Sequence, residues 1–180
     1  MMGPVKAIEF RRHAEREKDA DALSPEGRSH AEDVGRSLST DFAVVFVSPA
    51  RRAAETVAWF LRGSGQQLPQ HTVVRGLLSE EEDRWRSAGK AAGSSRVDAI
   101  AAEAPDLVER ESNRLKAVVE GLFDRVPEDG TALAVGHSPL IEAAVYGLTG
   151  VVIEPLSECQ GVAVARYGPG EYRLREIRDL

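Results

Sequence analysis

The sequence Phe42-Ala43-Val44-Val45-Phe46-Val47 is a continuous apolar run, rich in β-branched and aromatic residues. Such a run predicts a strand that is buried on both faces, as in a parallel sheet. Ser48-Pro49 follows directly, and apolar or small residues then recur on one helical face, at Ala53, Thr56, Val57, Phe60 and Leu61. A buried strand that leads into an amphipathic helix is typical of an α/β domain.

Working outward, four more segments have strand patterns: Val5–Phe10, Thr131–Val135, Gly161–Tyr167 and Glu171–Ile177. Gly168-Pro169-Gly170 predicts a turn, so the last two strands should form an antiparallel hairpin. A second helical face is predicted from Leu115, Val118, Val119, Leu122, Phe123 and Val126. The alternation predicts a three-layer α/β/α sandwich, with a mostly parallel sheet and a C-terminal antiparallel hairpin.

Three Ser-Pro pairs occur, at Ser24-Pro25, Ser48-Pro49 and Ser138-Pro139. Serine is a favoured N-cap residue, and proline is tolerated at the first helical position, where no backbone hydrogen bond is lost. We therefore expect each pair to begin a helix.

Length and charge exclude several classes of protein. The chain has 180 residues, which predicts a single domain over residues 1–180 at roughly 150 residues per domain. A net charge of −6 argues against nucleic-acid and membrane partners, and the longest clear apolar run is six residues. The lone Cys159 excludes an intrachain disulfide, and no charged leader precedes an apolar run, so a cytoplasmic protein is expected.

The segment 79–104 has weaker patterning. It begins with Ser79 and a run of acidic residues, and it continues through many small residues without a strong apolar face. A long segment of this kind in a compact domain is often a lid or binding loop, and the alternative is a mobile surface insertion without a role.

Three predicted strands end in residues that suit phosphate chemistry. Arg12 and His13 follow the first strand, Arg52 follows the Phe42–Val47 strand, and His137 and Ser138 follow Thr131–Val135. Ligands bind beyond the carboxyl ends of parallel strands, so these side chains should meet in one crevice. Arg11 and Arg51 should point elsewhere, because neighbouring side chains diverge.

The order of these residues resembles the histidine phosphatase superfamily, also called phosphoglycerate mutase-like. The resemblance rests on Arg12-His13, on the segment Ser48-Pro49-Ala50-Arg51-Arg52-Ala53-Ala54-Glu55-Thr56, on Gly136-His137 and on Leu23-Ser24-Pro25-Glu26-Gly27, and it runs from about Val5 to Gly150. Ala14 stands where many members have Gly. The resemblance points to the short phosphatase or phosphohistidine phosphatase-like branch.

The resemblance implies a covalent phosphohistidine intermediate on His13. Arg12 and Arg52 would bind the phosphoryl oxygens bidentately. His137 would donate a further hydrogen bond, and the helix that begins at Ser138 would add partial positive charge. No metal and no cofactor are expected.

Hydrolysis of an ester also benefits from a general acid. The family often places a Glu in a Leu-x-Glu context after the third strand. Leu78-Ser79-Glu80 matches, which makes Glu80 the first candidate and Glu81 the second, with Glu82 next in the run. A solvated acidic run is the alternative.

Several functions remain open. The substrate is a phosphorylated small molecule or a phosphohistidine protein, since a P–N bond to a protonated imidazole leaves readily without an acid. A phosphomutase is less favoured, because such members are generally longer. A non-catalytic phosphate-binding regulatory domain is a further alternative, and a serine hydrolase using Ser138 lacks the Gly-x-Ser-x-Gly pattern. The oligomeric state is not predicted.

Overall fold

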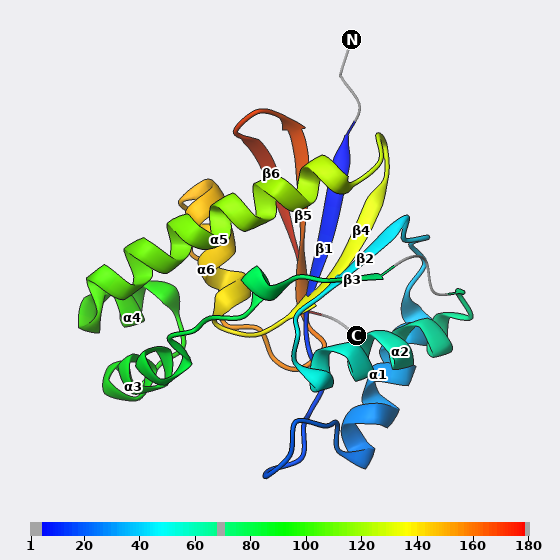
Figure 1. The fold of residues 1–180 in the computed structure, drawn as a ribbon, viewed down its shortest axis with the longest axis horizontal. Coiled ribbons are helices and arrows are strands. Elements are labelled where there is room, and N and C mark those ends of the chain that lie inside the picture. The colour runs from blue at the N-terminus through cyan, green and yellow to red at the C-terminus, as the bar shows by residue number, and fades with distance from the viewer. Residues whose placement is uncertain (1–4, 68–70, 179–180) are drawn as a thin grey trace.

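A computed structural model describes residues 5–67 and 71–178. Its six strands form one sheet in the order β3-β2-β4-β1-β5-β6 (Figure 1). The strands are β1 (Lys6–Arg12), β2 (Val44–Val47), β3 (His71–Val73), β4 (Thr131–Gly136), β5 (Gly161–Gly168) and β6 (Glu171–Ile177). The helices are α1 (Pro25–Ser37), α2 (Arg51–Ser64), α3 (Glu82–Ala92), α4 (Val97–Glu103), α5 (Pro105–Arg125) and α6 (Leu140–Thr149), with a short 3₁₀ helix η1 (Arg75–Leu77).

The sheet is mostly parallel, as predicted. β1 and β2 each pair in parallel with β4, and β2 also pairs in parallel with β3. β5 runs antiparallel to β1 and to β6, which confirms the C-terminal hairpin. Because β2, β4 and β1 are neighbours, the three predicted strand ends lie side by side at one edge of the sheet.

Both faces of the central strands are buried, which confirms the three-layer prediction. On β2, Phe46 packs into the core beneath α5 and α6, whereas Val45 and Val47 pack into the core beneath α1 and α2. Figure 1 shows α5 and α6 apart from the α1–α2 pair, with the strands between them. The predicted apolar face of α2 is buried in full.

Only one of the three Ser-Pro pairs begins a helix in the expected way. The Ser24 hydroxyl accepts a hydrogen bond from the Gly27 amide at 2.9 Å and caps α1. The predictions for the other two pairs are wrong, because α2 begins at Arg51 and α6 at Leu140. The hydroxyls of Ser48 and Ser138 contact other side chains instead, as described below.

The segment 79–104 is largely helical, and although its sequence shows no strong apolar face, both of its helices bury apolar side chains. Trp85 and Ala88 on α3 are buried, and so are Val97 and Ile100 on α4. The apolar positions on α3 are few, so the pattern is weak in sequence although the packing is real. A lid function for this segment stays a prediction.

Within residues 5–67 and 71–178, no helix has the length and apolar character needed to cross a membrane. Residues 1–4, on which most of the leader-sequence expectation rests, lie outside the described part of the chain.

Candidate active site

His13 lies directly after β1, with its backbone amide bonded to the Gly136 carbonyl on β4 at 3.0 Å. Its Nδ1 lies 2.7 Å from the Ala14 carbonyl oxygen. A carbonyl only accepts, so Nδ1 carries the proton and Nε2 has the free lone pair. The backbone therefore fixes the tautomer that a nucleophilic Nε2 requires.

The environment of His13 favours its neutral form. Burial lowers the pKa of His13 to about 4, and the charges of Arg52 and Arg12 act in the same direction against the Ala14 hydrogen bond. The imidazole is therefore unprotonated at neutral pH, which is the state of a nitrogen nucleophile.

Arg52, in the first turn of α2, connects both histidines. Its Nε donates to Nε2 of His13 at 3.3 Å, and one terminal nitrogen donates to Nδ1 of His137 at 3.1 Å. The other terminal nitrogen forms an ion pair with Asp21 at 2.8 Å. All three guanidinium nitrogens are thus held, and the group stands beside the nucleophilic atom.

His137 follows β4, and its ring centroid lies 5.2 Å from that of His13. Because Arg52 donates to Nδ1, the other nitrogen carries the proton and donates to the Ser48 hydroxyl at 2.7 Å. Burial, with help from Arg52, lowers the pKa of His137 to about 3. The Nε2–H group of His137, which was expected to donate to a phosphate, therefore donates to Ser48 in this structure. Nδ1 of His137 can donate to a phosphate only after the ring gains a proton.

Arg12, the last residue of β1, is half-buried. It donates to the Leu156 carbonyl at 2.7 Å and pairs with Glu158 at 3.0 Å. Its Nε is buried and has no hydrogen-bond partner within the described residues. Arg12 lies among the residues that line the same cavity as His13, Arg52 and His137.

Ser138 also lines this cavity, but its hydroxyl donates to the buried carboxylate of Glu142 at 2.5 Å. That proton is therefore not available to a phosphate. The same contact leaves Ser138 without a histidine base in the described part of the chain, so the geometry gives no support to a serine nucleophile.

The two neighbouring arginines point elsewhere, as predicted. Arg11 is buried against Glu9 at 2.6 Å and donates to the Cys159 carbonyl. Arg51 is exposed and pairs with Glu55 at 2.7 Å. Neither lines the cavity.

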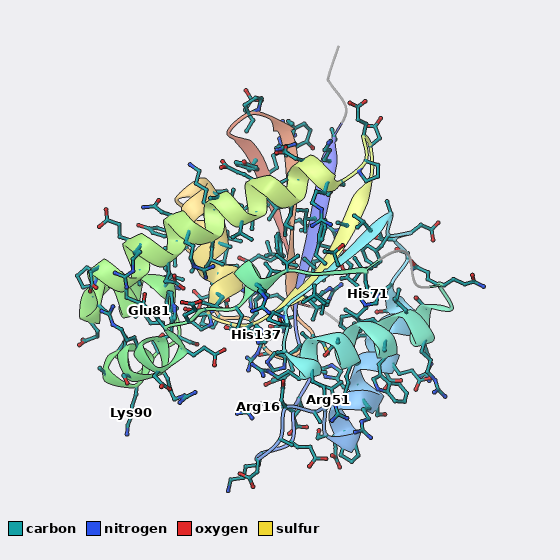
Figure 2. The ribbon with its side chains drawn as sticks, in the orientation of Figure 1. Arg16, Arg51, His71, Glu81, Lys90 and His137 are labelled. Atoms are coloured by element: carbon teal, nitrogen blue, oxygen red, sulfur yellow. The ribbon has the colours of Figure 1, made fainter. Side chains whose placement is uncertain are left out.

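The cavity has a volume of about 740 Å³. It lies between the strand ends, the loop after β1 and helices α3 and α4. We call the part lined by His13, Arg52 and His137 its inner end, and Figure 2 labels His137. Its lining residues are Arg12, His13, Glu15, Arg16, Arg52, Glu82, Trp85, Arg86, Gly89, Gly93, Ser94, Ser95, Ile100, His137, Ser138, Pro139, Leu140 and Glu158.

Of the acidic run Glu80–Glu82, the residue that lines the cavity is Glu82, while Glu15 and Glu158 line it from other parts of the chain. Glu80 is exposed and lies outside the set of lining residues. Glu81 is held by Arg84 and Arg110, with contacts of 2.8 and 2.5 Å, which lower its pKa. The structure therefore does not bring Glu80 to the site. The reason is that α3 begins at Glu82, and Glu82, Trp85, Arg86 and Gly89 share its cavity face.

Two further residues act on the site and were not found from the sequence. Asp21 accepts from the Arg52 side chain and from the amides of Arg51 and Arg52. Burial opposes ionisation of Asp21, but these hydrogen bonds outweigh it and lower its pKa. Glu158 holds Arg12 across 146 residues of sequence. Nothing in the local sequence distinguishes Asp21 from the other acids of its polar loop.

Within residues 5–67 and 71–178, no group of three or more His, Cys, Asp or Glu side chains could hold a metal ion. The polar groups of the inner end are instead guanidinium and imidazole, which suit an anion.

The model of the histidine phosphatase superfamily, branch 1, matches residues 8–179. No curated protein matches the chain.

Solved structures with the same fold cover nearly the whole chain. Phosphoglycerate mutase from Bacillus anthracis is 21% identical, with 98% of this chain and 94% of that chain covered and a TM-score of 0.75. Phosphoserine phosphatase from Entamoeba histolytica, in complex with 3-phosphoglyceric acid, is 15% identical over 97% and 98%, with a TM-score of 0.68. The protein histidine phosphatase SixA, complexed with tungstate, is 19% identical over 96% of both chains, with a TM-score of 0.58.

The family match extends over nearly the whole chain, including all three strand ends that build the site. The chain belongs to the histidine phosphatase superfamily, branch 1.

Proposed function

We propose that this chain is a metal-independent phosphatase that hydrolyses a small phosphomonoester through a phosphohistidine on His13. The observation that carries the proposal is the state of His13. Its Nε2 lone pair faces the Arg52 guanidinium at the inner end of the cavity, and its Nδ1 proton is held by the Ala14 carbonyl. A neutral, oriented imidazole beside two arginines is suited to attack on phosphorus.

In the first step, Nε2 of His13 forms a bond to phosphorus while the bond to the leaving oxygen breaks. The electron pair goes to that oxygen, which takes a proton from a general acid. Arg12 and Arg52 stabilise the charge on the equatorial oxygens. Water then attacks phosphorus, the P–N bond breaks, and its electron pair returns to Nε2.

Glu82 is the proposed general acid in place of Glu80. Glu82 is the carboxyl at the start of α3 that lines the cavity, on the side away from the strand ends. In the second step the resulting carboxylate accepts a proton from the attacking water.

A small ester is preferred over a phosphohistidine protein because of the cavity. Its volume of about 740 Å³ lies in the range of small-molecule sites, roughly 300–1,000 Å³. The α3–α4 segment encloses space beyond the phosphate position, where a leaving group would lie. Phosphohistidine transfer needs neither that space nor Glu82.

The test is to incubate the protein with a labelled phosphomonoester and to quench the reaction. We expect an acid-labile, alkali-stable phosphoenzyme that is absent in His13→Ala. Turnover without labelling, with full activity in His13→Ala, would overturn the mechanism. A non-catalytic phosphate-binding domain would bind the ester but neither label nor turn over.

The substrate class is tested by a panel of small phosphate esters and a phosphohistidine protein. We expect release of inorganic phosphate from at least one ester class at a higher kcat/KM than from the phosphohistidine protein. Transfer of the label to a second hydroxyl compound, rather than to water, would instead establish a mutase.

A further inference from the structure

Two arginines that line the cavity, Arg16 and Arg86, have no role in the proposed phosphoryl transfer. We call the part of the cavity formed by the loop after β1 and by α3 its outer wall. Arg16 lies on the loop after β1, three residues beyond His13, and Arg86 lies on α3, one turn after Glu82. Figure 2 shows Arg16 on that loop, between α3 and the α1–α2 pair. The two arginines therefore line one cavity from different elements.

Both guanidinium groups are available to a ligand. The Arg16 side chain makes no hydrogen bond or ion pair within residues 5–67 and 71–178. Arg86 pairs only with Asp83 there, on the same helix, with side chains that are 75% and 92% exposed. Such an exposed pair is weak and can exchange its partner. By contrast, Arg12 and Arg52 are each held by an acid from another part of the chain.

We propose that Arg16 and Arg86 form a second anion-binding position, which takes a carboxylate carried by the leaving group of the substrate. This proposal rests on the proposed function, since the cavity then holds the transferring phosphate at its inner end. Guanidinium groups bind carboxylate oxygens bidentately and stay charged at every working pH.

The local charge favours a monoanion over a second phosphate. Three acids line the cavity: Glu158, which is paired with Arg12, and Glu15 and Glu82. Arg16 and Arg86 are therefore set against two acids, one of which carries a proton in the proposed mechanism. The excess positive charge is small and suits a single negative charge. A second phosphate would bring about two charges against the same acids.

The experiment measures binding, so that it does not depend on turnover. Isothermal titration calorimetry compares ω-carboxyalkyl phosphonates with ω-hydroxyalkyl phosphonates of two to six carbons, which differ only in the terminal group. At one chain length we expect the carboxylate to bind roughly tenfold more tightly, as is typical of a charge-assisted hydrogen bond. α,ω-Bisphosphonates of the same lengths form the third arm.

Arg16→Gln and Arg86→Gln should each reduce the preference for carboxylate several-fold, and the double variant should abolish it. Lys90→Gln is the matched control, because Lys90 is an exposed cation on α3 that lies outside the cavity lining. It removes the same charge and should leave the preference unchanged.

Three results would overturn the second position: no carboxylate preference at any chain length, a preference that survives in the double variant, or an equal loss in Lys90→Gln. A larger gain for the bisphosphonates would overturn the assignment to a carboxylate. Failure of the proposed function is recognised separately, as absence of labelling on His13 while the phosphonates still bind.

Discussion

The inner end of the cavity and its outer wall are built in different ways. At the inner end, His13 and His137 are buried, and Arg52 has a partner for each of its guanidinium nitrogens. On the outer wall, Arg16 and Arg86 are exposed and have weak partners or none in the described part of the chain.

This difference separates two tasks of one site. A group that stabilises developing charge must be in place before the reaction, because reorganisation costs free energy at the transition state. A group that selects among leaving groups can adapt on binding. We therefore expect changes at the inner end to lower kcat steeply, and changes on the outer wall to alter the choice of substrate.

Of the substitutions in this site, Arg52→Ala should have the largest effect on kcat. Loss of one preorganised donor to transition-state charge costs about 10²–10³-fold in kcat. Arg51→Ala is the control, because the exposed Arg51 side chain lies outside the cavity lining and, within the described residues, pairs with Glu55 alone. Steady-state kinetics with one phosphomonoester would check both variants. Comparable losses in Arg51→Ala would remove the special position of Arg52.

Glu82→Gln tests whether the outer wall takes part in the chemistry. We expect a decrease of about 10²-fold for alkyl phosphates, whose leaving oxygen needs a proton, and a much smaller one for 4-nitrophenyl phosphate. Glu80→Gln should keep its activity, since Glu80 is exposed and lies outside the cavity lining. The opposite outcome, with Glu80→Gln the impaired variant, would restore the assignment made from the sequence.

Asp21→Asn should have a smaller effect, because Asp21 acts through Arg52. Asparagine keeps an acceptor for the backbone amides but loses the ion pair at 2.8 Å. Removal of such a supporting partner lowers kcat by about tenfold, and KM should not rise, since a charge that opposes phosphate is also removed. Asp19→Asn, an exposed acid on the same loop, is the control. A rise in KM at constant kcat would show that Asp21 serves substrate binding instead.

The sheet was predictable because its central strands are buried on both faces. The run that contains Val45, Phe46 and Val47 predicts a buried strand even when the strands that pair with it are not known. The parallel order of β2, β4 and β1 then brings the ends of these strands together. The α3–α4 segment was not predictable in the same way. Its core contribution consists of four residues at wide spacing, among them Trp85 and Ile100, and they are buried where α3 packs on α4 and α4 packs on α5 and α6.

The inner end of the site follows from the same strand order. His13, Arg52 and His137 are each adjacent to a strand or to the helix after it, so their meeting depends on topology alone. The capping predictions for Ser48 and Ser138 failed because each hydroxyl has a competing side-chain partner, at His137 and Glu142. Ser48 and His137 are 89 residues apart, so that contact has no local signal, whereas Ser138 and Glu142 lie only four residues apart.

The pH dependence of stability provides the most subtle test of the inner end. Burial lowers the pKa of His13 to about 4 and that of His137 to about 3, against 6.5 for the free side chain. Between these values the unfolded chain binds protons that the folded chain does not, so the free energy of unfolding should decrease as pH falls from about 6.5 towards 4. Well above pH 6.5 these histidines are neutral in both the folded and the unfolded chain, and this contribution stays constant.

His137→Gln removes one of these protons. Across pH 5 to 6, its free energy of unfolding should therefore vary by about 1 kcal/mol less than that of the unsubstituted chain. Urea unfolding at several pH values measures this difference, and titrations of other groups largely cancel in the comparison. An identical pH dependence in both proteins would mean that His137 titrates near 6.5 in the folded state. The inner end would then be as open to water as the outer wall, and the contrast on which the preceding predictions rest would be lost.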